Sequence, residues 1–333
     1  MKIIIPMAGM GKRMRPHTLT TPKPLIPIAG KPMVQHIVED IIKVCDEQVD
    51  EIAFIINRQF EKEAENNLIV VANNFGAKGS IYYQDEALGT AHAIMCAKDC
   101  LTGKVVVAFA DTLFIANFKM DSSQEGIIWV QKVDDPKPFG VVKLDANNVI
   151  TEFVEKPQKF VSDLAIIGIY YFKDGEYLKR ELQFLLDNKI TDKGEYQLTN
   201  ALENMKAKGT KFVSGKVTEW LDCGNKDATV YTNQRILEVN KNSVRQSKFI
   251  NQNSTIIEPC FIGENVQLIN STVGPYLSIG ENSIIENSVV KNCIIQTNSK
   301  ILNAELSNSM IGNYAEFTGK SSNMSIGDYN TIR

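Results

Sequence analysis

The sequence predicts an open α/β fold with a mixed sheet, followed by a C-terminal left-handed parallel β-helix. Over the first 240 or so residues, short apolar runs alternate with amphipathic segments of helical period, as in sheets with crossover helices. Further along, an Ile-Gly motif and regularly placed aliphatic residues repeat. We therefore expect one domain at 1–240, a polar linker at 241–253 and a repeat domain at 254–333.

Strands and helices are expected to alternate from the first residues to about residue 110. The strands are expected at 3–5, 51–57, 79–84 and 105–110, and the helices at 32–46, 61–74 and 89–99. This order implies parallel strands with right-handed crossovers. Ligands of such sheets bind beyond the carboxyl ends of the strands, where the loop after the first strand, residues 84–90 and Asp111 are expected.

From about residue 126 the chain becomes rich in strand patterns. Further strands are expected at 127–133, 139–144, 149–155 and 165–172, and helices at 175–187, 197–208 and 226–238. We expect these strands to extend the parallel core into a mixed sheet.

A recurring motif defines the repeat domain. Its copies begin at Ile262, Ile279, Ile311 and Ile326, each followed by Gly and a polar residue, with aliphatic residues recurring in between. This is the hexapeptide pattern of a parallel β-helix, in which each coil stacks its aliphatic corner on the next. The alternative is an antiparallel sandwich.

Composition narrows the function classes. The 333 residues carry a formal net charge of −3 with a pI near 5.8, so the overall charge gives no sign of nucleic-acid binding. The six cysteines form no C-x-x-C pair, which favours packing over metal binding and suits a reducing cytoplasm. No signal peptide and no apolar run of membrane-spanning length are expected.

A glycine loop with basic residues follows the first strand. Gly9 and Gly11 let the backbone approach a triphosphate and turn its N–H groups toward it. Arg13 and Lys23 add positive charge, and four prolines stiffen the stretch. The sequence therefore predicts a phosphate-binding loop.

Two commoner phosphate loops are excluded by residue type. The dinucleotide fingerprint G-x-G-x-x-G needs glycine where this chain has Met14, and the Walker pattern fails at Pro6 and Arg13. An ordinary surface loop is the remaining alternative, but the bunching of glycines and basic residues behind a strand favours a phosphate site.

The set G-x-G-x-R, Pro-x-Thr and Pro-Lys-Pro resembles the signature of the nucleoside-diphosphate-sugar pyrophosphorylases, or sugar-1-phosphate nucleotidylyltransferases. The resemblance continues to about residue 240 and implies a Rossmann-like, glycosyltransferase-A-like catalytic domain. It is closest in pattern to the glucose-1-phosphate thymidylyl- and uridylyltransferases. The resemblance implies nucleotide and pyrophosphate contacts from five residues of this loop: Ala8, Gly9, Gly11, Arg13 and Lys23.

Two aspartates are the candidate ligands for Mg²⁺. Asp111 follows an apolar strand, and Asp222 stands in Trp-Leu-Asp-Cys-Gly just before a helix. Mg²⁺ is commonly bound by one or two carboxylates together with substrate phosphates. The resemblance implies that both aspartates are metal ligands, although Thr112 departs from the residue that usually follows the first one.

The resemblance also implies base and sugar contacts. The amide of Gln84 offers a donor and an acceptor to a pyrimidine edge, and Gly89 allows close backbone approach. His92 is expected to pack or to form a local hydrogen bond. The sugar phosphate is expected to contact four residues: Gly140, Glu155, Lys156 and Lys193.

The predicted reaction is Mg²⁺-dependent transfer of a nucleotidyl group from a nucleoside triphosphate, dTTP or UTP being favoured, to a sugar-1-phosphate, glucose-1-phosphate being favoured. No protein nucleophile is needed, because an anionic phosphate oxygen attacks; Arg13, Lys23 and Lys156 are the expected catalytic residues. The base and the sugar stay open, since guanylyl transfer to mannose-1-phosphate shares the Leu-Gly-Thr-Ala stretch.

Two functions from other classes are the alternatives. Acetyl transfer by the β-helix would need a histidine base, and residues 254–333 contain none. A non-catalytic regulatory subunit would be expected to lose the loop Arg, the Lys or a metal Asp, and this chain keeps them all. We also expect a homo-oligomer assembled through the β-helix, and expect removal of 254–333 to disturb assembly more than chemistry.

Overall fold

The computed structural model describes residues 1–9, 11–240 and 248–333, and this part divides into two compact units. Unit 1 contains Met1–Gly9 and Ile37–Trp220, and unit 2 contains Met10–His36 and Leu221–Arg333. Residues 241–247 of the expected linker lie outside the described residues, and Ile250–Gln252 near its end form strand β14 of the repeat region; the boundaries at 240 and 254 stay predictions.

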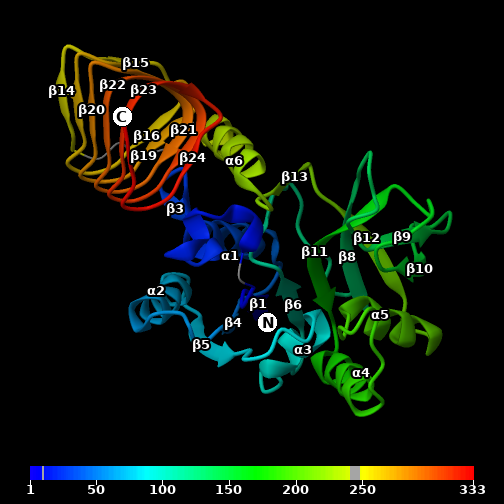
Figure 1. Cartoon of the computed structure of the whole chain (residues 1–333). Coiled ribbons are helices and arrows are strands. Elements are labelled where there is room, and N and C mark those ends of the chain that lie inside the picture. The colour runs from blue at the N-terminus through cyan, green and yellow to red at the C-terminus, as the bar shows by residue number, and fades with distance from the viewer. Residues whose placement is uncertain (10, 241–247) are drawn as a thin grey trace. The chain divides into compact units, whose positions relative to one another are not determined.

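The centre of unit 1 is a mixed sheet in the order β10-β9-β11-β6-β1-β4-β5, with β8 pairing with β11 and β12 pairing with β8 (Figure 1). Strands β1, β4, β5 and β6 are parallel, β11 runs antiparallel to β6, and β8 runs antiparallel to β11. The strands are β1 (Lys2–Pro6), β4 (Glu51–Ile56), β5 (Lys78–Tyr83), β6 (Val105–Ala108), β7 (Thr112–Ile115), β8 (Gly126–Lys132), β9 (Val141–Leu144), β10 (Ile150–Val154), β11 (Leu164–Phe172) and β12 (Phe212–Lys216).

Apolar residues at strand and helix spacing build the core of unit 1. Ile4 of β1, Ile55 of β4 and Val107 of β6 are fully buried in a cluster that also takes in Leu182 and Leu202. Helices α3, α4 and α5 pack on one another, and α2 packs on β5 (Figure 1). The helices are α1 (Met33–Val44), α2 (Lys62–Asn73), α3 (Thr90–Cys96), α4 (Gly175–Asp187) and α5 (Leu198–Ala207).

The α/β fold class is confirmed, and the expected helix at 175–187 has the observed bounds. Several expected elements are longer than the observed ones, among them the helix expected at 32–46, which spans Met33–Val44, and the strand expected at 139–144, which spans Val141–Leu144. Helix α3 ends at Cys96 because the next residues form i→i−3 turns, such as Ala97 N–H to Ile94 O at 3.1 Å. Strand β6 ends at Ala108 because the chain then turns, with Thr112 N–H donating to Phe109 O at 3.2 Å. Strands β7 and β12 were not predicted.

The N-terminal part of unit 2 has little regular structure. Three 3₁₀ turns, Lys12–Met14, His17–Leu19 and Lys23–Leu25, are followed by a hairpin of β2 (Pro27–Ile28) and β3 (Lys31–Pro32). Helix α6 (Lys226–Val239) begins at Asn225, whose Oδ1 accepts from Ala228 N–H at 3.0 Å. Helix α6 packs against β2 and against β19, β21 and β22 of the repeat region.

The repeat region curls into a parallel β-helix, as predicted, and Figure 1 shows its stacked coils. Along one face Ile250 pairs with Gln267, which pairs with Ile284 on the next coil. The strands are β14 (Ile250–Gln252), β15 (Thr255–Ile256), β16 (Cys260–Ile262), β17 (Gln267–Ile269), β18 (Thr272–Val273), β19 (Leu277–Ile279), β20 (Ile284–Glu286), β21 (Val289–Ile295), β22 (Lys300–Ile311), β23 (Glu316–Ser322), β24 (Ser325–Ile326) and β25 (Thr331–Ile332).

Asparagines turn the corners of this β-helix. Asn265, Asn282, Asn287 and Asn303 have φ between +48° and +57°, a left-handed conformation that asparagine tolerates. Their side chains also join successive coils, as in Asn265 Nδ2 to Asn282 Oδ1 at 3.2 Å. The short polar side chain therefore serves both the turn and the stacking.

The Ile-Gly motifs lie above one another. Gly263 N–H donates to Ile279 O, and Gly312 N–H donates to Ile326 O. The coil between Gly280 and Gly312 places Gln296 at this corner, which explains why the motif skips one turn of the sequence. Fully buried aliphatic residues, including Ile262, Ile279 and Ile311, fill the interior.

Candidate functional site

Three predicted site segments lie at the carboxyl ends of the parallel strands of unit 1. Ala8 and Gly9 follow β1, Gln84 follows β5 and Asp111 follows β6. The register continues into these ends, since Gln84 N–H donates to Ile56 O at 2.9 Å. Strand pairing therefore brings these residues to one edge of the sheet, as the parallel order predicts.

A tight turn presents Asp111. Thr112 N–H donates to Phe109 O at 3.2 Å, and the glycine at 168 accepts the Phe109 N–H. Gly168 has φ +86°, and a methyl carbon there would lie 3.2 Å from Thr112 Oγ1. This glycine in β11 shapes the Asp111 turn, and only tertiary packing reveals its role.

Gln84 is buried, with 8% of its surface exposed, and its amide is oriented by two neighbours. Nε2 lies 3.3 Å from Gly89 O and 3.2 Å from His92 Nδ1. With Nε2 so engaged, Oε1 is the atom able to accept a hydrogen bond from a ligand. His92 thus has a local hydrogen-bonding role.

Hydrogen bonds join the segment 88–91 to the segment 196–198. Tyr196 N–H donates to Leu88 O at 2.8 Å, and Ala91 N–H donates to Tyr196 O at 2.9 Å. Thr90 Oγ1 accepts from Leu198 N–H at 2.8 Å. Sequence reasoning missed this pairing, because it joins residues more than one hundred positions apart.

Lys193 lies at the tip of a tight turn leading into this pairing. Asp192 and Glu195 exchange backbone hydrogen bonds of 2.9 and 3.0 Å around Lys193 and Gly194. Both turn residues have positive φ, +50° and +84°. Lys193 is therefore exposed on a turn whose base is tied to the Gly89 segment.

Gly140, Glu155 and Lys156 gather at a second place in unit 1. Lys156 Nζ lies 3.6 Å from Glu155 Oε1, and Lys156 N–H donates to Phe139 O at 3.1 Å. Thr199 Oγ1 donates to Glu155 Oε2 at 3.2 Å, so α5 helps to orient the carboxylate. A methyl carbon on Gly140 would lie 3.1 Å from Glu155 Oε2, so only glycine leaves this carboxylate its full space.

Burial and the Glu155 carboxylate both raise the pKa of Tyr170 above its ordinary value. Tyr170 is 6% exposed and stands on β11. Its phenol is therefore neutral at physiological pH.

The glycine loop of unit 2 is built around Gly11. Its φ of +56° is left-handed, and its carbonyl accepts from Met14 N–H at 2.9 Å and from Thr18 Oγ1 at 2.8 Å. Thr18 therefore explains the Pro-x-Thr part of the motif. Arg13 is exposed, whereas Lys23 is buried with 8% exposure.

Asp222 ends β13 (Glu219–Asp222), just before helix α6. Thr232 Oγ1 donates to Asp222 O at 3.3 Å. A methyl carbon on Gly224 would lie 2.7 Å from Asp222 Oδ2, so the Asp-x-Gly spacing keeps room for the carboxylate. Gly11, Arg13, Lys23 and Asp222 thus belong to unit 2, and the other predicted site residues to unit 1.

The donor chemistry of the two aspartates fits a hard cation. Among the described residues, no group of three or more His, Cys, Asp or Glu side chains forms a metal cage. Mg²⁺ does not need such a cage, because it retains waters and takes oxygens from substrate phosphates. Carboxylate oxygens are hard ligands, so Asp111 and Asp222 each suit Mg²⁺ by donor type.

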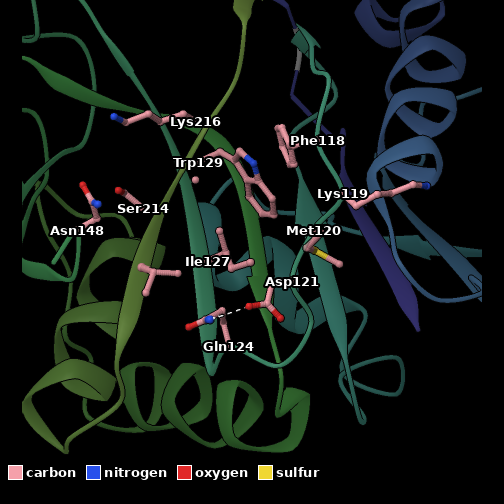
Figure 2. A pocket seen from close by; sticks show the side chains of 12 residues that line it. Phe118, Lys119, Met120, Asp121, Gln124, Ile127, Trp129, Asn148, Ser214 and Lys216 are labelled. Carbon is pink, nitrogen blue, oxygen red and sulfur yellow. Dashed lines mark hydrogen bonds between the residues drawn. The ribbon is translucent and has the colours of Figure 1, made fainter.

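A separate pocket of about 520 Å³ lies in unit 1 against one face of β8 and β12 (Figure 2). Trp129 stacks on Phe118 with ring centroids 6.1 Å apart. A methyl carbon on Gly215 would meet the Trp129 indole at 2.8 Å. None of the predicted site residues, all of which are described, lines this pocket, so it is not the candidate site.

Comparison with known proteins shows the family. The family model described as nucleotidyl transferase matches residues 2–239. The chain therefore belongs to the nucleotidyl transferase family, which confirms the resemblance in its motifs. Among the described residues, no helix is both long and apolar enough to cross a membrane.

Curated relatives differ in how much of their length is matched. The chain is 34% identical over 242 residues to the bifunctional protein GlmU of Methanocaldococcus jannaschii, covering 72% of this chain and 55% of that protein. It therefore spans about half the length of this relative. It is 26% identical over 319 residues to the low-salt glycan biosynthesis nucleotidyltransferase Agl11 of Haloferax volcanii, covering 86% of this chain and 84% of that protein.

Solved structures show the same fold. A UDP-glucose pyrophosphorylase complexed with UDP-glucose matches with a TM-score of 0.58 and 24% identity, covering 72% of this chain and 98% of that one. A putative glucose-1-phosphate thymidylyltransferase from Bacillus anthracis, in complex with a sucrose, matches with a TM-score of 0.57 and 24% identity, covering 70% of this chain and 93% of that one. At this identity the likeness is one of fold.

Proposed function

We propose that this protein is a sugar-1-phosphate nucleotidylyltransferase, which forms a nucleoside-diphosphate sugar and pyrophosphate. The observation that carries the proposal is the Glu155–Lys156–Gly140 group, beside the orienting Thr199, in a chain of this family with an intact glycine–arginine loop. A phosphate-binding lysine next to a hydroxyl-binding carboxylate suits a sugar phosphate.

The chemistry requires alignment and charge stabilisation. Lys156 holds the phosphate of the sugar-1-phosphate, whose oxygen attacks the α-phosphorus of the triphosphate and displaces pyrophosphate. Arg13 and Lys23 stabilise the charge on the phosphates, the arginine as a planar fork and the lysine as a point charge. Ala8, Gly9 and Gly11 supply backbone groups to the same phosphates.

Asp111 and Asp222 are the residues that we propose hold Mg²⁺. When bound, the ion neutralises phosphate charge and orients the triphosphate. The carboxylates supply hard oxygen ligands, which suit this ion, and the steric room beside Asp222 at Gly224 supports this assignment.

For the nucleotide, we favour dTTP or UTP. Gln84, with Oε1 able to accept and Gly89 close by, suits the N3–H of a pyrimidine ring. For the sugar we favour glucose-1-phosphate, contacted by Gly140 and Glu155, with Lys193 near the phosphates. Relatives by fold that are titled a UDP-glucose pyrophosphorylase and a putative glucose-1-phosphate thymidylyltransferase support this choice.

A second candidate is guanylyl transfer to mannose-1-phosphate. The chain is 35% identical over 185 residues to the mannose-1-phosphate guanylyltransferase catalytic subunit beta of Drosophila melanogaster, covering 51% of this chain and 48% of that protein.

A non-catalytic nucleotide-sugar-binding subunit is the candidate from another class. Arg13, Lys23 and both aspartates favour catalysis over it.

We place the reaction in the cytoplasm, since all six cysteines, each among the described residues, are thiols and five are buried.

We further propose a homo-oligomer through the β-helix. Tyr314 and Tyr329 stack with centroids 5.0 Å apart while 51% and 71% exposed. A second copy of the chain is the occupant that we propose for this aromatic surface.

The test is a pyrophosphate-release screen of the full chain with Mg²⁺, five nucleoside triphosphates and several sugar-1-phosphates. Release with dTTP or UTP and glucose-1-phosphate is expected. Lys156→Met should lower kcat/KM for the sugar phosphate about 10- to 100-fold, from the loss of a charge-assisted hydrogen bond. Lys159→Met, an exposed neighbour, is the matched control. No release from any pair by folded protein overturns the proposal.

A further inference from the structure

The loop with Arg13 and Lys23 belongs to the same compact unit as the β-helix. Residues 11–32, the described stretch before helix α1, contain only short 3₁₀ turns and a hairpin of two two-residue strands. Turn hydrogen bonds such as Leu25 N–H to Pro22 O at 2.9 Å fix this stretch locally, but no helix or long strand fixes its course, which therefore depends on the surface against which it packs.

The first anchor of the loop is on the coil that contains β24. Thr20 Oγ1 donates to Asp328 Oδ2 at 2.6 Å, and His17 Nε2 lies 3.2 Å from Ser325 Oγ. His17 is buried, with 1% exposure. These two contacts span more than three hundred residues of sequence and lie between the positions of Arg13 and Lys23.

The Asp328 carboxylate is itself held in place. Its Oδ1 accepts from Asn313 N–H at 2.8 Å, and its Oδ2 accepts from Asn313 Nδ2 at 3.1 Å. Next to it, a methyl carbon on Gly327 would lie 2.9 Å from Pro16 Cβ, so the loop sits directly on the coil. A fixed carboxylate is able to hold Thr20 in one position.

The second anchor is at the hairpin that follows Lys23. Asn233 of α6 is fully buried, and its Oδ1 accepts from Ala29 N–H at 2.9 Å and from Ser278 Oγ at 2.6 Å. A methyl carbon on Gly30 would lie 2.2 Å from the Phe261 ring. Coils near both ends of the β-helix thus hold the two flanks of Lys23.

We propose that the β-helix positions the phosphate-binding loop, with Thr20 and Asp328 as positioning residues that act through Arg13 and Lys23. This inference rests on the function proposed above and assigns the β-helix a part in nucleotide use. It argues against the expectation that removal of 254–333 would disturb assembly more than chemistry, because the loop would lose its first anchor and the second would lose its contacts with Ser278 and Phe261.

The first test is steady-state kinetics of Thr20→Val in the full chain. The valine keeps the shape and removes the hydroxyl, so kcat/KM for the nucleoside triphosphate should fall about threefold to tenfold. KM for the sugar-1-phosphate should stay unchanged, since Glu155 and Lys156 are untouched. A merely structural effect would lower the active fraction and hence apparent kcat, with both KM values unchanged.

Two controls sharpen this test. Thr20→Ser restores the hydroxyl and should restore wild-type KM, whereas Thr331→Val makes the same change on an exposed threonine of the same region. In a double-mutant cycle with Asp328→Asn, the effect of Thr20→Val should shrink, because both changes weaken one hydrogen bond. Wild-type kinetics for Thr20→Val, equal damage from Thr331→Val or full additivity each overturn the inference.

Hydrogen exchange separates this inference from the proposed function. Amides of residues 11–26 should exchange faster in Thr20→Val than in wild type, and Thr331→Val should leave them unchanged. If wild-type protein makes no product but this exchange difference appears, the proposed function fails and the anchoring stands. If wild type turns over and neither kinetics nor exchange changes, the anchoring fails.

Discussion

Gly89 lies against the backbone of Tyr196 so closely that a methyl carbon on Gly89 would be 2.5 Å from the Tyr196 carbonyl oxygen. Gly89 also has φ +109°, a conformation that side-chain-bearing residues rarely adopt. Gly89 therefore lets the segment expected to contact the base pack against the segment that leads to Thr199. Thr199 in turn donates a hydrogen bond to Glu155.

Gly89→Ala should destabilise the protein by about 1–3 kcal/mol from backbone strain alone and raise KM for the nucleoside triphosphate. Gly209→Ala is the matched control, since Gly209 has φ +103° and nothing within 4 Å of an added methyl carbon. Thermal unfolding and kinetics measure both. Equal KM values in the two variants would remove the Gly89–Tyr196 contact from nucleotide binding.

Asp111→Asn and Asp222→Asn should each abolish turnover while the unfolding temperature stays close to that of wild type. Each change removes a charge and keeps the shape, so a cation loses a ligand. The exposed Asp134→Asn is the control for a generic change of charge. Near-normal rates at saturating Mg²⁺ would exclude the substituted residue from the metal site.

Gln84→Leu should lower kcat/KM for the preferred pyrimidine nucleotide by about tenfold or more, because a base edge is left without its hydrogen-bond partner. In wild type, dTTP or UTP should be preferred over GTP by more than about tenfold, or about 1.4 kcal/mol. Competition between labelled triphosphates measures both. A guanosine preference would instead favour the mannose-1-phosphate candidate.

His17 should make the fold sensitive to acid. Burial lowers the pKa of His17 from 6.5 to about 4, against an opposing effect of Asp328 and with a smaller lowering effect of Lys226. Between these values the unfolded state binds more protons than the folded state, so stability falls as pH drops from about 6.5 to about 4. The loss should reach at most about 3 kcal/mol.

Urea unfolding of wild type and His17→Gln at several pH values tests this effect. The difference between the two curves isolates His17 from the carboxylates that titrate in the same range. His17→Gln should show a shallower fall between pH 6.5 and 4. Parallel curves would mean that His17 does not carry the acid sensitivity.

Tyr314→Glu with Tyr329→Glu should lower the molar mass measured by light scattering. Two buried charges at an aromatic contact would repel and cost desolvation. Phe160→Glu, which changes a residue 75% exposed in unit 1, should leave the mass unchanged. A monomeric wild-type protein, or an unchanged mass in the double variant, would contradict assembly through this surface.

The α/β alternation, the β-helix and the family could all be predicted from the sequence. These features are local: apolar residues such as Ile3–Ile5 recur at the period of their own element, and the Ile-Gly copies at 262 and 279 repeat one coil apart. The phosphate-binding loop could also be predicted from the sequence, because close backbone approach to a phosphate favours glycine and nearby positive charge.

The contacts between distant segments could not be predicted, because they depend on tertiary packing. Thr20 bonds to Asp328, Leu88 pairs with Tyr196, and Gly168 shapes the turn of Asp111 across strands. No repeating pattern in the sequence marks these contacts, because they form only when distant segments pack against one another. Strand β12 was missed for the same reason: its residues take the strand conformation through pairing with β8.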